Sequence, residues 1–194
     1  MSAARETRID DARTDTTRSS GGGIAFLIAY AITLGVCGLL GLYLSPHQTA
    51  MATLIQGGLA LPLALGLERS MGFPAMRADN PMKPLVLHMA FAQVVALPAV
   101  VIVLGLDPSW VPAAFAAIAG GQLLPYAWVH RTKAYVFLGA AVALVPAAIR
   151  LAGGPNAMPY SLLAWSTLYV LGAIVIRSQV AARTALPIGA REVE

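Results

Sequence analysis

The sequence predicts an all-α fold: a polytopic membrane helix bundle with six transmembrane helices. Of its 194 residues, 58% are hydrophobic and 11% are charged, and the mean hydropathy is +0.71. These values lie outside the usual range for soluble globular domains. Six apolar segments follow one another, each near the ~20 residues that a helix needs to cross about 30 Å of hydrocarbon. Connections rich and poor in lysine and arginine alternate between them, as expected for repeated membrane crossings.

The N-terminal residues 1–23 carry four arginines, four acidic residues and several Ser and Thr, and they end in three consecutive glycines. We expect a disordered cytoplasmic tail here, because such a composition cannot bury a core. The apolar run that follows is too long for the core of a secretory signal, so we expect it to be a retained span. Residues 24–178 are assigned to a single six-helix transmembrane domain and 179–194 to a cytoplasmic C-terminal tail.

The six expected spans are separated by charged residues, prolines and turn residues. A proline lies in or beside the first turn of three of them, where a missing backbone donor does little harm. The fifth span is short, so Arg150 near its end is expected to extend toward the membrane surface. The spans cover residues 24–44, 49–67, 85–106, 110–129, 134–152 and 159–176.

Positive charge gives the expected orientation. Of the 13 Lys and Arg residues, all but Arg150 lie in the two tails and in the connections after the second and fourth spans. Because positive connections stay in the cytoplasm, we expect an inner (plasma) membrane protein with both termini cytoplasmic. The expected partners are the lipid bilayer and, at the basic connections, anionic lipid. A homo-oligomer remains open, and the charge gives no argument for nucleic acid.

Small residues recur at four-residue spacing in the fourth and fifth spans: in Ala113, Ala117 and Gly121, in Ala116 and Gly120, and in Gly139, Ala143 and Ala147. This spacing lets two helix backbones approach closely. The two spans are joined by only about four residues, so we expect an antiparallel helical hairpin that uses these faces.

Polar side chains gather in the cytoplasmic half of the third and fourth spans. Counting about 1.5 Å per residue, Gln93 and Gln122 reach the same depth. His88 and Tyr126 share a shallower depth, and His130 lies at the rim. Gln122, Tyr126 and His130 are spaced four apart and so share a helix face. We take these five residues as candidates for substrate binding.

Two interpretations of these residues remain open. In one, they line a cytoplasm-facing cavity of a small-solute permease. In the other, the glutamines bond neighbouring helices in a structural or accessory subunit, each contact contributing on the order of 0.6–2 kcal/mol. The histidines lack metal-ligand spacing and Cys37 is the only cysteine, so we expect no metal, cofactor or disulfide. The sequence contains no nucleophile elbow, phosphate-binding loop or zinc-protease motif, which weighs against an enzyme and leaves no catalytic residue to assign.

Two short motifs stand out in the middle of the chain. The Asn80-Pro81 step is closely followed by Leu85. The motif Leu123-Leu124-Pro125-Tyr126 precedes a set of further matching residues, Trp128, Lys133 and Tyr135. On these residues, which extend over the second to fifth segments, the chain resembles a family of small bacterial multi-pass membrane proteins known only as a domain of unknown function. The resemblance implies a single compact helical domain and no particular activity, substrate or catalytic residue.

Reporter fusions test the predicted topology directly. Fusions in the connections poor in positive charge are expected to report the external side, at Gln48, Pro108 and Asn156. Fusions after positively charged segments are expected to report the cytoplasm, after Arg77, Thr132 and Arg183. One reversed reporter among otherwise consistent fusions would contradict six crossings.

Overall fold

The computed structural model describes residues 3–185, and the side chains of all of these except residues 3–7, 90 and 183–185. The described chain is helical, without a strand. Its elements are α1 (Ala3–Ser20), α2 (Ile24–Gly41), α3 (Pro46–Ser70), α4 (Lys83–Leu106), the 3-10 helix η1 (Pro108–Trp110), α5 (Val111–Val129), α6 (Ala134–Gly153), the 3-10 helix η2 (Pro155–Ala157) and α7 (Met158–Ala185).

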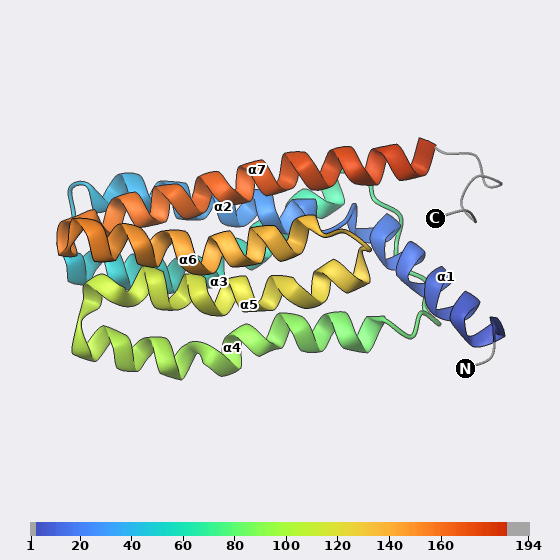
Figure 1. The fold of residues 1–194 in the computed structure, drawn as a ribbon, viewed down its shortest axis with the longest axis horizontal. Coiled ribbons are helices and arrows are strands. Elements are labelled where there is room, and N and C mark those ends of the chain that lie inside the picture. The colour runs from blue at the N-terminus through green and yellow to red at the C-terminus, as the bar shows by residue number, and fades with distance from the viewer. Residues whose placement is uncertain (1–2, 186–194) are drawn as a thin grey trace.

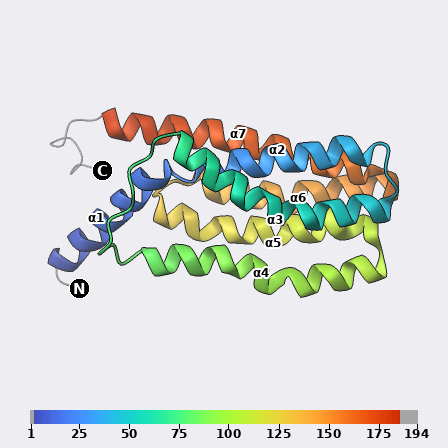
Figure 2. The same cartoon turned by 180° about the vertical axis from the view of Figure 1, so that it is seen from behind.

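Helices α2 to α7 run up and down along one long axis, each antiparallel to the one before it (Figures 1 and 2). Helix α2 packs against α3 and α7, α6 packs against α5 and α7, and α4 borders α5 on the outside of the bundle. Helix α1 leaves the bundle obliquely at one end, where α7 also ends (Figure 1). We call this the α1 end; η1 and η2 lie at the opposite end.

Five helices are long and apolar enough to cross a membrane: α2, α3, α4, α6 and α7. The all-helical fold is therefore confirmed, and five of the six expected spans meet this criterion. Helix α5 is not among the five, although it has 19 residues and no charge. Its sequence contains two adjacent glycines and Gln122, Pro125 and Tyr126, all of which lower its hydropathy.

The N-terminal segment differs from the disordered tail that its composition predicted, because Ala3–Ser20 forms helix α1. Contacts with a distant loop hold it. The Asn80 side-chain nitrogen lies 3.0 Å from the Ala12 carbonyl oxygen, 2.7 Å from Asp15 Oδ2 and 3.2 Å from Thr16 Oγ1. At the other terminus α7 continues to Ala185, beyond the boundary expected at residue 178. Residues 186–194 of the predicted C-terminal tail lie outside the described residues.

Helices α5 and α6 form the expected antiparallel hairpin, and their backbones touch at two glycines. A Cβ atom placed on Gly139 would lie 2.6 Å from the Gly120 carbonyl oxygen, and one placed on Gly120 would lie 2.9 Å from the Ala143 nitrogen. A side chain at either position would push the two backbones apart. The neighbouring Gly121 faces outward, with nothing within 4 Å of an added Cβ.

This difference between adjacent glycines predicts opposite effects of one substitution. Gly120→Ala is expected to lower the free energy of unfolding by about 1–3 kcal/mol, because the added methyl overpacks a backbone contact. Gly121→Ala is the matched control and is expected to be neutral or stabilising by about 0.5–1 kcal/mol, because glycine disfavours the helix. Unfolding in detergent can be followed at neutral pH by the reaction of a thiol dye with the buried Cys37. Equal stability of the two variants would contradict the close contact.

Candidate functional site

An aromatic cluster closes the bundle at the α1 end. Tyr126 on α5 and His130, which caps that helix, stand four residues apart and therefore share a face. Their rings stack, with centroids 5.9 Å apart and an interplanar angle of 7°. Tyr135 on α6 approaches both rings, with centroid distances of 5.7 Å to Tyr126 and to His130. The α5–α6 hairpin thus brings the three rings together.

Helix α1 covers this cluster. Thr17 Oγ1 lies 3.0 Å from His130 Nδ1 and forms a hydrogen bond with it. The Tyr135 hydroxyl donates a hydrogen bond to the carbonyl oxygen of Gly22, in the connection between α1 and α2. His130 is 3% exposed and Tyr135 is 2% exposed, so neither ring is open to solvent while α1 is docked.

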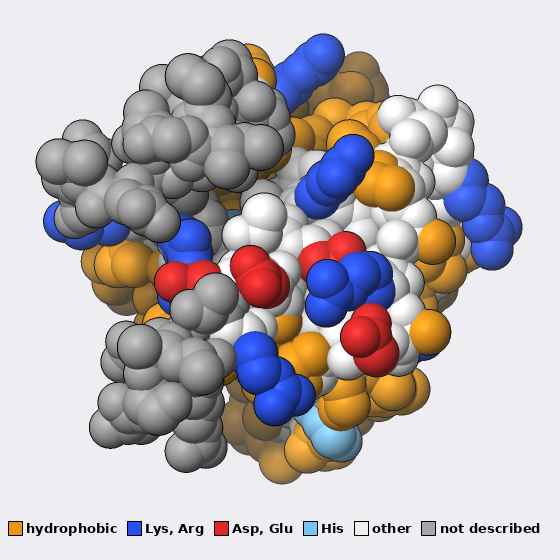
Figure 3. All heavy atoms as spheres, turned by 90° about the vertical axis from the view of Figure 1, so that its right-hand side faces the viewer, with side chains coloured by type: hydrophobic (Ala, Val, Ile, Leu, Met, Phe, Trp, Pro, Cys, Tyr) orange, Lys and Arg blue, Asp and Glu red, His pale blue; other side chains and the backbone are white. Residues whose placement is uncertain are grey.

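Charged side chains also hold α1 against the end of α5. The Arg13 guanidinium lies over the Trp128 ring, 4.6 Å from its centroid, and donates a hydrogen bond to the Trp128 carbonyl oxygen. Arg131 forms an ion pair with Asp10 of α1. Figure 3, which looks onto this end, shows charged side chains gathered here with hydrophobic side chains around the rim.

Burial keeps His130 neutral. Its enclosure lowers the pKa of the imidazole from 6.5 to about 4, and the nearby positive charge of Arg13 contributes in the same direction. The His130 ring, to which Thr17 of α1 is hydrogen-bonded, is therefore uncharged near neutral pH.

A second group of polar side chains lies deeper in the bundle. Gln56 of α3 is 3% exposed, and its Oε1 accepts a hydrogen bond of 2.8 Å from Thr33 of α2. Gln93 of α4 is half-buried and lies close to the Tyr30 side chain of α2. Gln122 of α5 is half-buried as well. Three of the helices around the interior thus contribute an amide.

Two of these amides keep an unused donor. The Nε2 atoms of Gln56 and Gln122 are enclosed and have no hydrogen-bond partner among the described residues. Leaving such a donor unpaired costs about 1–3 kcal/mol. The interior therefore favours a group that accepts hydrogen bonds from these two nitrogens.

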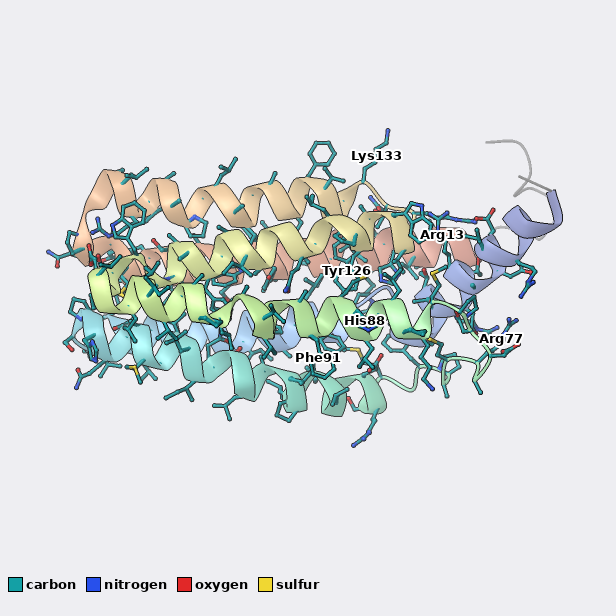
Figure 4. The ribbon with its side chains drawn as sticks, turned by 90° about the horizontal axis from the view of Figure 1, so that it is seen from below. Arg13, Arg77, His88, Phe91, Tyr126 and Lys133 are labelled. Atoms are coloured by element: carbon teal, nitrogen blue, oxygen red, sulfur yellow. The ribbon has the colours of Figure 1, made fainter. Side chains whose placement is uncertain are left out.

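The five candidate residues predicted from the sequence differ in burial and in their neighbours. The structure brings Tyr126 and His130 together and half-buries Gln93 and Gln122. His88 is exposed on α4 and does not join the aromatic cluster (Figure 4). Sequence reasoning did not identify Tyr30, Thr33 and Thr17 as polar partners, because a tyrosine or threonine in an apolar run gives no signal of its own.

Two pockets lie elsewhere, at the end opposite α1. One has a volume of about 380 Å³ and is bordered by α4, α5 and α6. The other, of about 250 Å³, is bordered by the α2–α3 connection, by η2 and by the start of α7. Among the described side chains, no group of three or more His, Cys, Asp or Glu is placed to hold a metal ion.

The depressed pKa of His130 predicts how stability depends on pH. Between pH 6.5 and about 4 the unfolded chain binds a proton at this ring and the folded chain does not. Stability is therefore fully present above pH 6.5 and falls as the pH is lowered, by up to about 3 kcal/mol near pH 4. His130→Gln is expected to remove this dependence, whereas His88→Gln at an exposed position should retain it. Melting temperatures followed by tryptophan fluorescence from pH 7 to 4 give the comparison, and identical slopes for the His130→Gln variant and the unmodified protein would contradict it.

Comparison with known proteins gives one family match. The chain matches no curated protein and no solved structure. Residues 9–179, which include most of α1 and all of α2 to α6, match a family described as a family of unknown function, DUF7010. Since this match extends over most of the chain, the protein belongs to the DUF7010 family of unknown function.

Proposed function

We propose that the protein crosses the inner (plasma) membrane six times, with both termini in the cytoplasm. The course of α5 supports the sixth crossing, because α4 and α6 both begin at the α1 end and α5 runs back between them (Figure 2). Two parallel crossings by α4 and α6 require a return through the bilayer. The concentration of Lys and Arg at the α1 end supports the orientation.

We further propose that the bundle is a permease for a small, uncharged polar solute. The observation that carries this proposal is the pair of enclosed and unpaired amide donors of Gln56 and Gln122. Each can donate a hydrogen bond to a carbonyl or hydroxyl oxygen of a solute. The interior groups at this level are amides, hydroxyls and aromatic rings, so an ion would find no opposite charge to offset its loss of hydration.

In this proposal Gln56, Gln93 and Gln122 bind the solute, and Tyr126 and His130 border its path to the α1 end. Because α1 covers the aromatic cluster, it must move for the solute to pass. The connection to α2 suits such movement, since Gly21, Gly22 and Gly23 all have positive φ values that glycine adopts without strain.

A second candidate function is that of a structural or accessory membrane subunit, in which the glutamines bond neighbouring helices. The outward position of α4 favours it. Only 12% of the apolar window of α4 is buried, and Phe91, Val95 and Ile102 are more than half exposed. A helix of a partner could cover this face.

Uptake by reconstituted protein separates the two functions. Liposomes with the full chain are expected to take up at least one solute from a panel of small polyols, amides and neutral amino-acid analogues faster than protein-free liposomes. Gln122→Leu is expected to reduce that initial rate by about tenfold, because it removes one hydrogen bond to the solute. Thr167→Val is the matched control, since it replaces a polar side chain that is exposed on α7. No uptake of any panel member, or unchanged uptake by Gln122→Leu, would reject the permease and favour the accessory function.

A further inference from the structure

The larger pocket is a groove in the bundle surface at the end opposite α1. Val103 and Leu106 of α4 border it, and five alanines of α5 and α6 line it, including Ala117 and Ala143. The small alanine side chains leave space that a larger apolar group can fill. With a volume of about 380 Å³, the groove is large enough for part of a hydrocarbon chain.

One end of the groove is charged, unlike the rest of its lining. Asp107 and Trp110 lie there, and Arg150 contacts both. The Arg150 Nη2 atom donates a hydrogen bond of 3.1 Å to Asp107 Oδ2, and its guanidinium carbon lies 4.9 Å from the centroid of the Trp110 ring. The Arg150 Nε atom donates to Ser109 Oγ at 2.8 Å. A positive and a negative group thus stand side by side where the apolar groove ends.

Both charges have bonding capacity left. A carboxylate offers about four acceptor sites, and Asp107 uses three: for the Ser109 nitrogen, the Ser109 hydroxyl and Arg150. The Asp107 side chain is 45% exposed. On Arg150, the bonds to Ser109 and Asp107 use Nε and Nη2, so Nη1 is the guanidinium nitrogen that remains for another acceptor.

The carboxylate is ionised at neutral pH. Hydrogen bonds from the Ser109 hydroxyl and backbone, followed by the positive charge of Arg150, lower the pKa of Asp107 below its usual value. The groove end therefore presents one full negative and one full positive charge, with no net charge of its own.

We propose that this groove binds a phospholipid with an ethanolamine headgroup. An acyl chain lies against the alanines, the phosphate accepts a hydrogen bond from Arg150, and the ammonium group donates one to Asp107. An anionic headgroup fits less well, because Asp107 repels its net charge. A choline headgroup fits less well too, because its nitrogen carries no hydrogen to donate. The site depends on the membrane location proposed above and not on transport.

Lipid binding to the purified full-length protein in detergent tests this assignment. Native mass spectrometry is carried out with dioleoyl phosphatidylethanolamine, phosphatidylglycerol and phosphatidylcholine, added singly and in pairs. We expect one phosphatidylethanolamine molecule to be retained at concentrations about fivefold lower than the other two lipids, a preference typical of a partly exposed ion pair.

Two variants connect that preference to the groove. Ala117→Leu fills the groove and is expected to abolish the retained lipid. Ala140→Leu makes the same change at an exposed alanine of α6 that does not line the groove, and is expected to bind as the unmodified protein does. Asp107→Asn is expected to retain a lipid but lose the preference for ethanolamine. Melting temperatures in lipid-free detergent verify that each variant is folded.

Four results would overturn the proposal. Equal retention of the three lipids would mean unspecific annular lipid. A preference for phosphatidylglycerol would mean that Arg150 acts alone. Unchanged binding by folded Ala117→Leu would place the lipid elsewhere, and a dimer that this variant dissociates would assign the groove to a second copy of the chain. The lipid measurements do not depend on the uptake assay, so transport can fail while lipid binding stands, and the reverse.

Discussion

The backbones of α5 and α6 touch at Gly120 and Gly139, and this contact determines where the polar groups of the bundle lie. Two antiparallel helices that meet without side chains between them have one favourable register. In that register Tyr126, six residues beyond Gly120, comes level with Tyr135, four residues before Gly139, and their rings meet at 5.7 Å. His130 then stacks on Tyr126, and α1 can dock on His130. A single close approach of two backbones therefore fixes a contact between one and two helical turns away.

The two ends of the bundle differ in the polar groups that they enclose. At the α1 end the aromatic cluster consists of uncharged rings, and its one imidazole is held neutral by burial. At the opposite end a nearly buried guanidinium lies beside a carboxylate, a hydroxyl and an indole ring. A neutral interior can exchange hydrogen bonds with a passing solute at little electrostatic cost. A paired charge is better suited to holding one molecule in a fixed place.

Most of the fold was predictable because a bilayer leaves few choices. Backbone groups in hydrocarbon must pair within their own segment, so long apolar runs become helices, and the spacing of small residues correctly predicted the α5–α6 hairpin. Helix α1 was not predictable, since what holds it is Asn80 and His130, which lie far along the chain and carry no local signal. The depth counted along the helix placed Gln122 within the bundle, where the structure half-buries it. The same count gave no indication that His88 is exposed. The sequence of α4 is apolar on every side, so nothing in it indicates which face turns toward the bundle.

The contacts of α1 also impose an order on biosynthesis. This helix leaves the ribosome before the bundle helices, yet Thr17 can bond His130 only after a further 113 residues have been made. At about 5–20 residues per second, that delay lasts roughly 6–23 s, during which the α2–α4 segments are inserted. An apolar helix would be at risk of entering the bilayer or associating with other nascent chains in that interval. A hydrophilic helix stays in water until its partners arrive, so its polarity serves the assembly of the protein as well as the finished structure.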